Sequence, residues 1–154
     1  MILLSACFAH EPEKPKRQGQ VVPSFKMMLT DSMTYFKTND IPAGKPFVLF
    51  YFGPYCPYSR AQMEEIVNST DALKDINFYA LTIAPLSEVK EFSEHYQLSK
   101  HKNITVGIDY NNFFSGYFET NLVPCMAIYG KDRKLNDVFI GNTQGNQIKR
   151  SAEL

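Results

Sequence analysis

The sequence predicts an α/β protein with three layers, in which a mixed central sheet lies between helices on both faces. Two observations lead to this prediction. Short apolar runs alternate with segments of helical periodicity over most of the chain, and the last two apolar runs are separated only by a turn at residues 130–133. Alternating strands and helices are typical of a mostly parallel sheet, whereas two strands joined by a tight turn form an antiparallel hairpin.

The first half of the chain is expected to supply two strands. Residues 21–29 form an extended stretch, and residues 31–45 are rich in turn-forming residues. Residues 46–52 then read Pro-Phe-Val-Leu-Phe-Tyr-Phe. A continuous apolar run of this kind is typical of a central strand that is covered on both faces, so its phenylalanines are expected in the core.

A helix is expected to follow this strand after a break at residues 53–55. Cys56 precedes Pro57, and proline is tolerated in the first turn of a helix because its missing N–H would have no partner there. The apolar residues that follow recur at roughly helical spacing. We expect this helix to end near residues 69–71.

The second half of the chain continues the alternation and ends in the hairpin and a closing helix. Strands are expected at residues 76–83, 104–108, 125–129 and 135–140. Helices are expected to start with Ser87 as an N-cap, to span residues 111–119 and to close the chain at residues 144–154.

The N-terminal residues divide the chain into residues 1–20 and a folded domain at residues 21–154. Leu4-Ser5-Ala6-Cys7 resembles a bacterial lipobox, which implies a lipid anchor on Cys7 and a periplasm-facing place in the cell envelope. Only six residues precede this cysteine, fewer than a full signal peptide contains. Either translation starts further upstream or the match is a coincidence. Residues 10–20 are polar and contain two prolines, so we expect a disordered tether.

The overall composition excludes several classes of function. The 16 basic and 16 acidic residues give no net charge, which argues against a nucleic-acid partner. The three cysteines are too few for a disulfide scaffold, and their spacing does not suit zinc. We therefore expect neither a metal site nor a bound cofactor.

The order of elements and the short motifs resemble the thioredoxin fold. An apolar strand, an aromatic break, Cys56-Pro57-Tyr58-Ser59 at a helix start and Val123-Pro124 before the hairpin carry this resemblance. The additional N-terminal strand and the helix at residues 111–119 are similar to the TlpA-like, redoxin branch of bacterial cell envelopes. The four-residue motif itself resembles that of monothiol glutaredoxins.

The resemblance implies a role for each of these residues. Cys56 would be the nucleophile, with its pKa lowered by the helix N-terminus, and the hydroxyl of Ser59 would donate to its sulfur. Pro124 would follow a cis peptide bond, leaving the backbone of Val123 free to pair with an extended substrate. Pro57 and Tyr58 of the motif would contribute to substrate binding, together with Tyr55, which precedes the cysteine.

The sequence departs from the active members of these families at three positions. Ser59 replaces the second cysteine, Phe50 replaces a buried acid, and Gly141 lacks the second glycine that glutaredoxins use to bind glutathione. Cys125 has two interpretations, an unconventional resolving cysteine or a small buried residue of a central strand.

Three functions therefore remain open. The first is a monothiol thiol–disulfide oxidoreductase of the cell envelope, in which Cys56 forms mixed disulfides with protein thiols or disulfides and an external reductant resolves them. The second is a non-catalytic thioredoxin-fold module that binds a partner beside Cys56. The third is a thiol peroxidase, for which Leu49 and Gly53 occupy positions where peroxiredoxins carry a proline and a threonine or serine.

Overall fold

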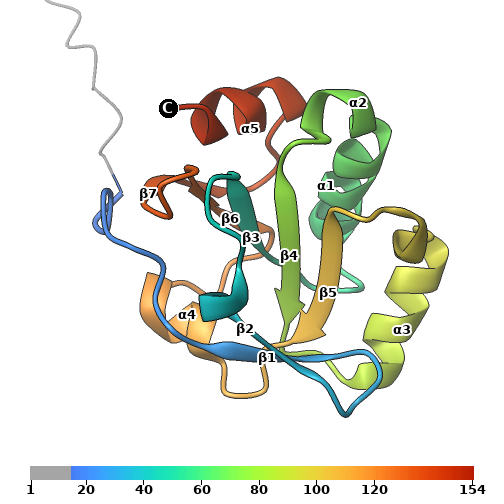
Figure 1. The fold of residues 1–154 in the computed structure, drawn as a ribbon. Helices are drawn as coiled ribbons and strands as arrows, with labels where there is room; N and C mark the ends of the chain where they lie inside the picture. Colours follow the sequence, from blue (N-terminus) through green and yellow to red (C-terminus); the bar gives the residue numbers. More distant parts are fainter. Residues whose placement is uncertain (1–14) are drawn as a thin grey trace, which may run out of the picture.

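The computed structural model describes residues 15–154, which form one seven-stranded sheet and its covering helices (Figure 1). The strands are β1 (Lys26–Leu29), β2 (Tyr35–Lys37), β3 (Phe47–Tyr51), β4 (Asn77–Thr82), β5 (Ile104–Ile108), β6 (Cys125–Tyr129) and β7 (Leu135–Ile140). The helices are α1 (Pro57–Asn68), α2 (Thr70–Leu73), α3 (Leu86–His95), α4 (Phe113–Phe118) and α5 (Gly145–Ala152), with 3-10 turns η1 (Thr38–Asp40) and η2 (Leu98–Lys100).

The sheet is mixed, with the strand order β2-β1-β5-β4-β3-β6-β7. β4 pairs in parallel with both β3 and β5, while every other pairing is antiparallel. The expectation of a mostly parallel sheet is therefore wrong, although the mixed thioredoxin-like sheet and its antiparallel C-terminal hairpin are confirmed. The reason is that the N-terminal strand β1 also runs antiparallel, against β5, and adds a second antiparallel edge.

Two separate apolar cores cover the two faces of the sheet. Helices α1, α3 and α5 contribute to the first core, whereas α4 packs on the opposite face (Figure 1). Side chains of a strand alternate between its faces, so Val48 and Phe50 of β3 join the first core while Leu49 and Tyr51 join the second. All five residues of β3 are buried, as the continuous apolar run predicted.

Two local features differ from the expectations. The turn-rich residues 31–45 contain β2, a strand of only three residues that pairs with β1 as a hairpin. Phe36 is the residue of β2 that packs against the interior, where its ring stacks on Tyr79 with centroids 4.8 Å apart. Helix α3 begins at Leu86 rather than after Ser87, because the carbonyl of Pro85 already accepts the N–H groups of its first turn.

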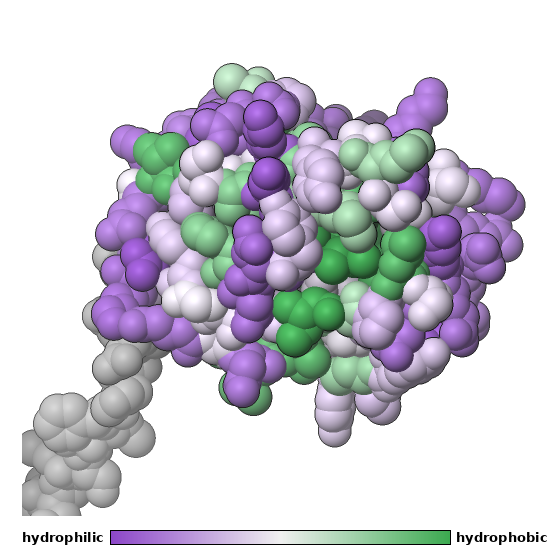
Figure 2. Space-filling view, turned by 90° about the horizontal axis from the view of Figure 1, so that it is seen from below, coloured by the Kyte–Doolittle hydropathy of each residue, from purple (hydrophilic) through white to green (hydrophobic). Residues whose placement is uncertain are grey.

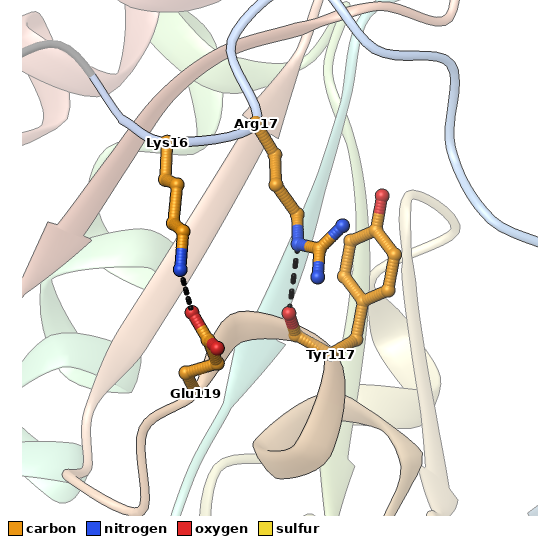
Figure 3. Close-up of polar contacts among 4 residues, drawn as sticks. All are labelled: Lys16, Arg17, Tyr117 and Glu119. Carbon is orange, nitrogen blue, oxygen red and sulfur yellow. Dashed lines mark hydrogen bonds and ion pairs between the residues drawn. The ribbon is translucent and has the colours of Figure 1, made fainter.

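The N-terminal residues 15–20, here called the strap, pack against the domain instead of continuing the expected tether. Lys16 Nζ lies 2.8 Å from Glu119 Oε2, and Arg17 Nε donates to the carbonyl of Tyr117 over 2.9 Å (Figure 3). The Arg17 guanidinium also lies 4.0 Å from the centre of the Tyr117 ring. These contacts stabilise the strap where composition alone indicated disorder.

The expected lipobox and its Cys7 lie outside the described residues. Within residues 15–154, no helix has the length and the apolar character that crossing a membrane requires.

Candidate functional site

Cys56 lies at the start of α1, where the chain leaves β3 and turns at Gly53. Its N–H donates to the Gly53 carbonyl over 3.0 Å, and its own carbonyl accepts the Arg60 N–H as the first bond of the helix. Cys56 is therefore the N-cap, with Pro57 as the first helical residue. The turn and the proline together place a partly exposed thiol at the positive end of the helix dipole.

The loop before β6 lies opposite this thiol. β6 runs antiparallel to β3, with Tyr51 facing Cys125, so the residue after one strand lies near the residue before the other. The Val123–Pro124 peptide bond is cis, and Cys56 Sγ lies 3.7 Å from the Val123 carbonyl oxygen. A Cβ on Gly53 would lie 3.3 Å from the Cβ of Cys56 and 3.4 Å from the Val123 side chain, so Gly53 packs closely between the two.

The first turn of α1 favours ionisation of the Cys56 thiol. Partial burial acts to raise its pKa, but the Ser59 N–H, the Ser59 hydroxyl and the Tyr58 N–H outweigh burial and lower the pKa below its usual value. The thiol caps no N–H of α1 and instead donates to Val123. The N–H groups of the first turn therefore remain available to a thiolate, as helix starts commonly are to anions.

Ser59 occupies the position of the missing second cysteine and is 0% exposed. Its hydroxyl oxygen accepts the Gly53 N–H over 3.1 Å. The hydroxyl proton is thus left to be donated toward Cys56, in agreement with its lowering effect on the pKa of that thiol. Ser59 connects the turn before α1 with the sulfur and cannot itself form a disulfide.

Cys125 lies in a different environment from Cys56. Its side chain is 0% exposed and belongs to the second core, on the α4 side of the sheet, whereas α1 packs on the first core. Burial raises the pKa of Cys125 to about 12. This placement agrees with the interpretation of Cys125 as a small buried residue of a strand. Phe50, in place of the family's acid, is wholly buried in the first core.

Exposed apolar side chains surround the edge of the sheet where Cys56 lies. Tyr55 and Tyr58 are 58% and 66% exposed, so both predicted aromatic residues face solvent. Figure 2 shows hydrophobic residues gathered on this face of the molecule. Three further exposed residues lie at this edge, one just after β4, one shortly before β6 and one at the end of β7. With the two tyrosines they define what we call the apolar rim: Ile83, Leu122 and Ile140.

The loop at residues 141–143 makes contacts with the site that the sequence did not predict. The Gly141 N–H donates to the Pro124 carbonyl over 2.9 Å, and Asn142 Nδ2 donates to the Tyr58 carbonyl over 2.7 Å. Thr143 exchanges two hydrogen bonds with the buried Gln62 of α1. A positive φ of 92° at Gly141 turns the chain into this loop, a conformation that favours glycine.

Most of the predicted site residues lie together in the structure. The structure brings together Cys56, Ser59 and Val123 at one edge of the sheet, with Pro57 and Pro124 beside them. It does not bring Cys125 to the exposed side of that edge. Among residues 15–154, no group of three or more potential metal-ligating side chains lies together.

Several solved structures have the same fold. A secreted disulfide oxidoreductase of Mycobacterium tuberculosis, homologous to E. coli DsbE, is 17% identical with a TM-score of 0.68 over 83% of this chain and 93% of its own. StoA from Bacillus subtilis is 14% identical, with a TM-score of 0.65 over 87% and 100%. Peroxidoxin BcpB from Mycobacterium tuberculosis is 13% identical, with a TM-score of 0.72 over 88% and 96%.

At these identities the structural similarities establish the thioredoxin-like fold. No curated protein matches the sequence. The sequence of residues 18–138, however, matches the AhpC/TSA family, a range that extends over most of the folded domain. The chain therefore belongs to the AhpC/TSA family.

Proposed function

We propose that the protein is a monothiol thiol–disulfide oxidoreductase that acts on protein substrates through Cys56. The observation that carries this proposal is the environment of the sulfur: a partly exposed thiol, with its pKa lowered by the first turn of α1, beside a hydroxyl instead of a second thiol. The thiolate is the reactive form of cysteine, so this environment favours nucleophilic attack.

The chemistry that follows needs one external reductant, a small or protein thiol. The Cys56 thiolate attacks one sulfur of a substrate disulfide, so that a mixed disulfide forms and the other substrate sulfur leaves as a thiolate that takes up a proton. A first external thiolate attacks Cys56 Sγ and releases the second substrate thiol. A second external thiolate then frees Cys56, and the two external thiols leave as a disulfide.

The apolar rim supports a protein rather than a small molecule as substrate. Exposed aromatic and aliphatic side chains around a polar centre are typical of surfaces that bind other proteins. Tyr55 is held in place by a hydrogen bond of 3.0 Å from its hydroxyl to Glu91 of α3. The rim thus offers contacts on both the α1 and α3 sides of the thiol.

Trapping of the mixed disulfide tests the proposal. The reduced full chain is mixed with a disulfide-bonded peptide, quenched with acid and analysed by mass spectrometry. We expect a one-to-one adduct on Cys56 that an added thiol removes, an adduct of unchanged yield in Cys125→Ser, and none in Cys56→Ser. A Cys56–Cys125 disulfide, or no adduct at all, would contradict the monothiol mechanism.

A thiol peroxidase is the second candidate, because the family match and the similarity to Peroxidoxin BcpB both favour it. In that reaction, the Cys56 thiolate would attack one oxygen of hydrogen peroxide, giving a sulfenic acid and releasing hydroxide. Gly53 offers no hydroxyl to the peroxide where peroxiredoxins carry one. Hydrogen peroxide that oxidises Cys56 no faster than a free cysteine would exclude this candidate.

We also propose a place in the cell envelope, facing the periplasm and anchored by a lipid on Cys7. The lipobox-like Leu4-Ser5-Ala6-Cys7 supports the anchor, and the similarity to a secreted oxidoreductase of Mycobacterium tuberculosis is consistent with such a place. Expression with a labelled fatty acid tests this. Label that is present in the wild type and absent from Cys7→Ala is expected, and an unlabelled wild type would contradict the anchor.

A further inference from the structure

The loop at residues 141–143 contacts the parts of the chain that surround Cys56. Gly141 binds the Pro124 carbonyl and Thr143 binds Gln62, while Asn142 reaches the first turn of α1. The Gly141 and Thr143 bonds hold the backbone of the loop on either side of Asn142. The Asn142 side chain is therefore presented to α1 from a fixed backbone.

The acceptor of the Asn142 amide lies in the first turn of the helix that Cys56 caps. Asn142 Nδ2 donates to the Tyr58 carbonyl over 2.7 Å, and this carbonyl belongs to the same peptide group as the Ser59 N–H. Hydrogen bonding to one end of a peptide group polarises it and strengthens the bond that the other end donates. The Ser59 N–H is the strongest of the influences that lower the pKa of Cys56.

We infer that Asn142 is a positioning residue for the Cys56 thiolate, because its amide orients and polarises the Tyr58–Ser59 peptide group, whose N–H a thiolate at the N-cap would accept. It acts through this peptide group and does not itself touch Cys56. The inference rests on the proposed function only in that it concerns the same thiol.

Charged groups on the neighbouring elements do not stabilise the Cys56 thiolate in place of the Tyr58–Ser59 peptide group. Arg60 of α1 donates to the Pro54 carbonyl, and Glu91 of α3 accepts from Tyr55. Neither of them, nor Glu88 of α3 or Cys125 of β6, is among the influences on the pKa of Cys56. The structure thus favours the thiolate through hydrogen bonds from the first turn of α1. Asn142 strengthens one of them, the bond that the Ser59 N–H donates to a thiolate.

Alkylation of Cys56 by iodoacetamide across a pH series, with the labelled peptide quantified by mass spectrometry, tests the inference on the full chain. We expect Asn142→Ala to raise the midpoint by about 0.5 pH unit, which is about a threefold loss of thiolate at a fixed lower pH. Asn142→Asp should raise it further, because a carboxylate cannot donate and adds a negative charge. Asn146→Ala is the matched control, since Asn146 is an exposed asparagine on α5, four residues along the chain.

The outcomes separate a positioning role from a structural one. A lower unfolding temperature with an unchanged midpoint in both Asn142 variants would overturn the inference, as would an equal shift in Asn146→Ala. Should either Asn142 variant fold poorly, the other provides the measurement. Alkylation needs neither a protein substrate nor a reductant, so a chain that failed to form mixed disulfides could still show the expected shift.

Discussion

The two cysteines of the described chain lie at the same edge of one sheet and have opposite properties. Cys56 caps a helix, is partly exposed and has a lowered pKa, whereas Cys125 begins a strand, is wholly buried and has a pKa raised to about 12. The two cysteines are close neighbours, since Sγ of Cys56 contacts the carbonyl of Val123, two residues before Cys125. The difference therefore comes from the direction of the side chain and its local donors.

The different environments of the two cysteines are the reason that we propose a monothiol rather than a dithiol site. A disulfide needs Cβ atoms that face each other across a short distance. The Cys125 side chain enters the core on the α4 side, while Cys56 belongs to the helix on the other side of the sheet. A thiolate at Cys125 would also be buried without a donor, which its raised pKa reflects.

The largest expected difference between the two cysteines is in stability. Cys125→Ser places a hydroxyl in an apolar core and should lower the free energy of unfolding by about 1–3 kcal/mol. Cys56→Ser changes a partly exposed N-cap and should stay within about 0.5 kcal/mol of the wild type. Urea denaturation of both variants measures this difference, and equal losses would contradict the contrast in burial.

A second prediction concerns the hydroxyl beside Cys56. Ser59→Ala removes a donor to the thiolate and should raise the alkylation midpoint of Cys56 by about 0.5–1 pH unit, given the strength of hydrogen bonds to charged groups. Ser151→Ala is the control, because Ser151 is also a buried serine and donates to Asp137 far from the site. An unshifted midpoint in Ser59→Ala would show that the helix N–H groups act alone.

A third prediction concerns the Cys125 side of the sheet, where the strap binds α4. Arg17→Ala removes a hydrogen bond and a cation–π contact and should lower the free energy of unfolding by about 1 kcal/mol. The Cys56 midpoint should not change. Lys16→Ala, which removes an exposed ion pair, should cost less. A shifted Cys56 midpoint in Arg17→Ala would show that the two faces of the sheet are coupled.

Much of the sheet edge that carries the candidate site could be predicted from the sequence because its signals are local. The apolar run before Gly53 and the Cys56-Pro57 pair define a strand, a turn and a helix start within about a dozen residues. The placement of Val123-Pro124 beside them came from the resemblance to the thioredoxin fold, in which a cis-proline precedes the strand of the hairpin. The burial of Cys125 was one of two open interpretations, since the facing direction of a first strand residue depends on register.

The features that could not be predicted depend on contacts between distant residues. Asn142 and Tyr58 are 84 positions apart, and no periodicity or motif marks the pair. The strap was assigned to a tether because its charges indicate solvation, yet Arg17 finds Tyr117 100 positions away. β2 was missed because three residues carry no detectable strand pattern and pair only once β1 is in place.

The most direct test of the account is the pH dependence of alkylation at both cysteines of the folded chain, each followed through its own labelled peptide. We predict a midpoint for Cys56 below the value of about 8.5 for a free cysteine, and no labelling of Cys125 at any pH at which the chain stays folded. A Cys56 midpoint at or above that of a free cysteine, or labelling of both cysteines over the same pH range, would contradict it.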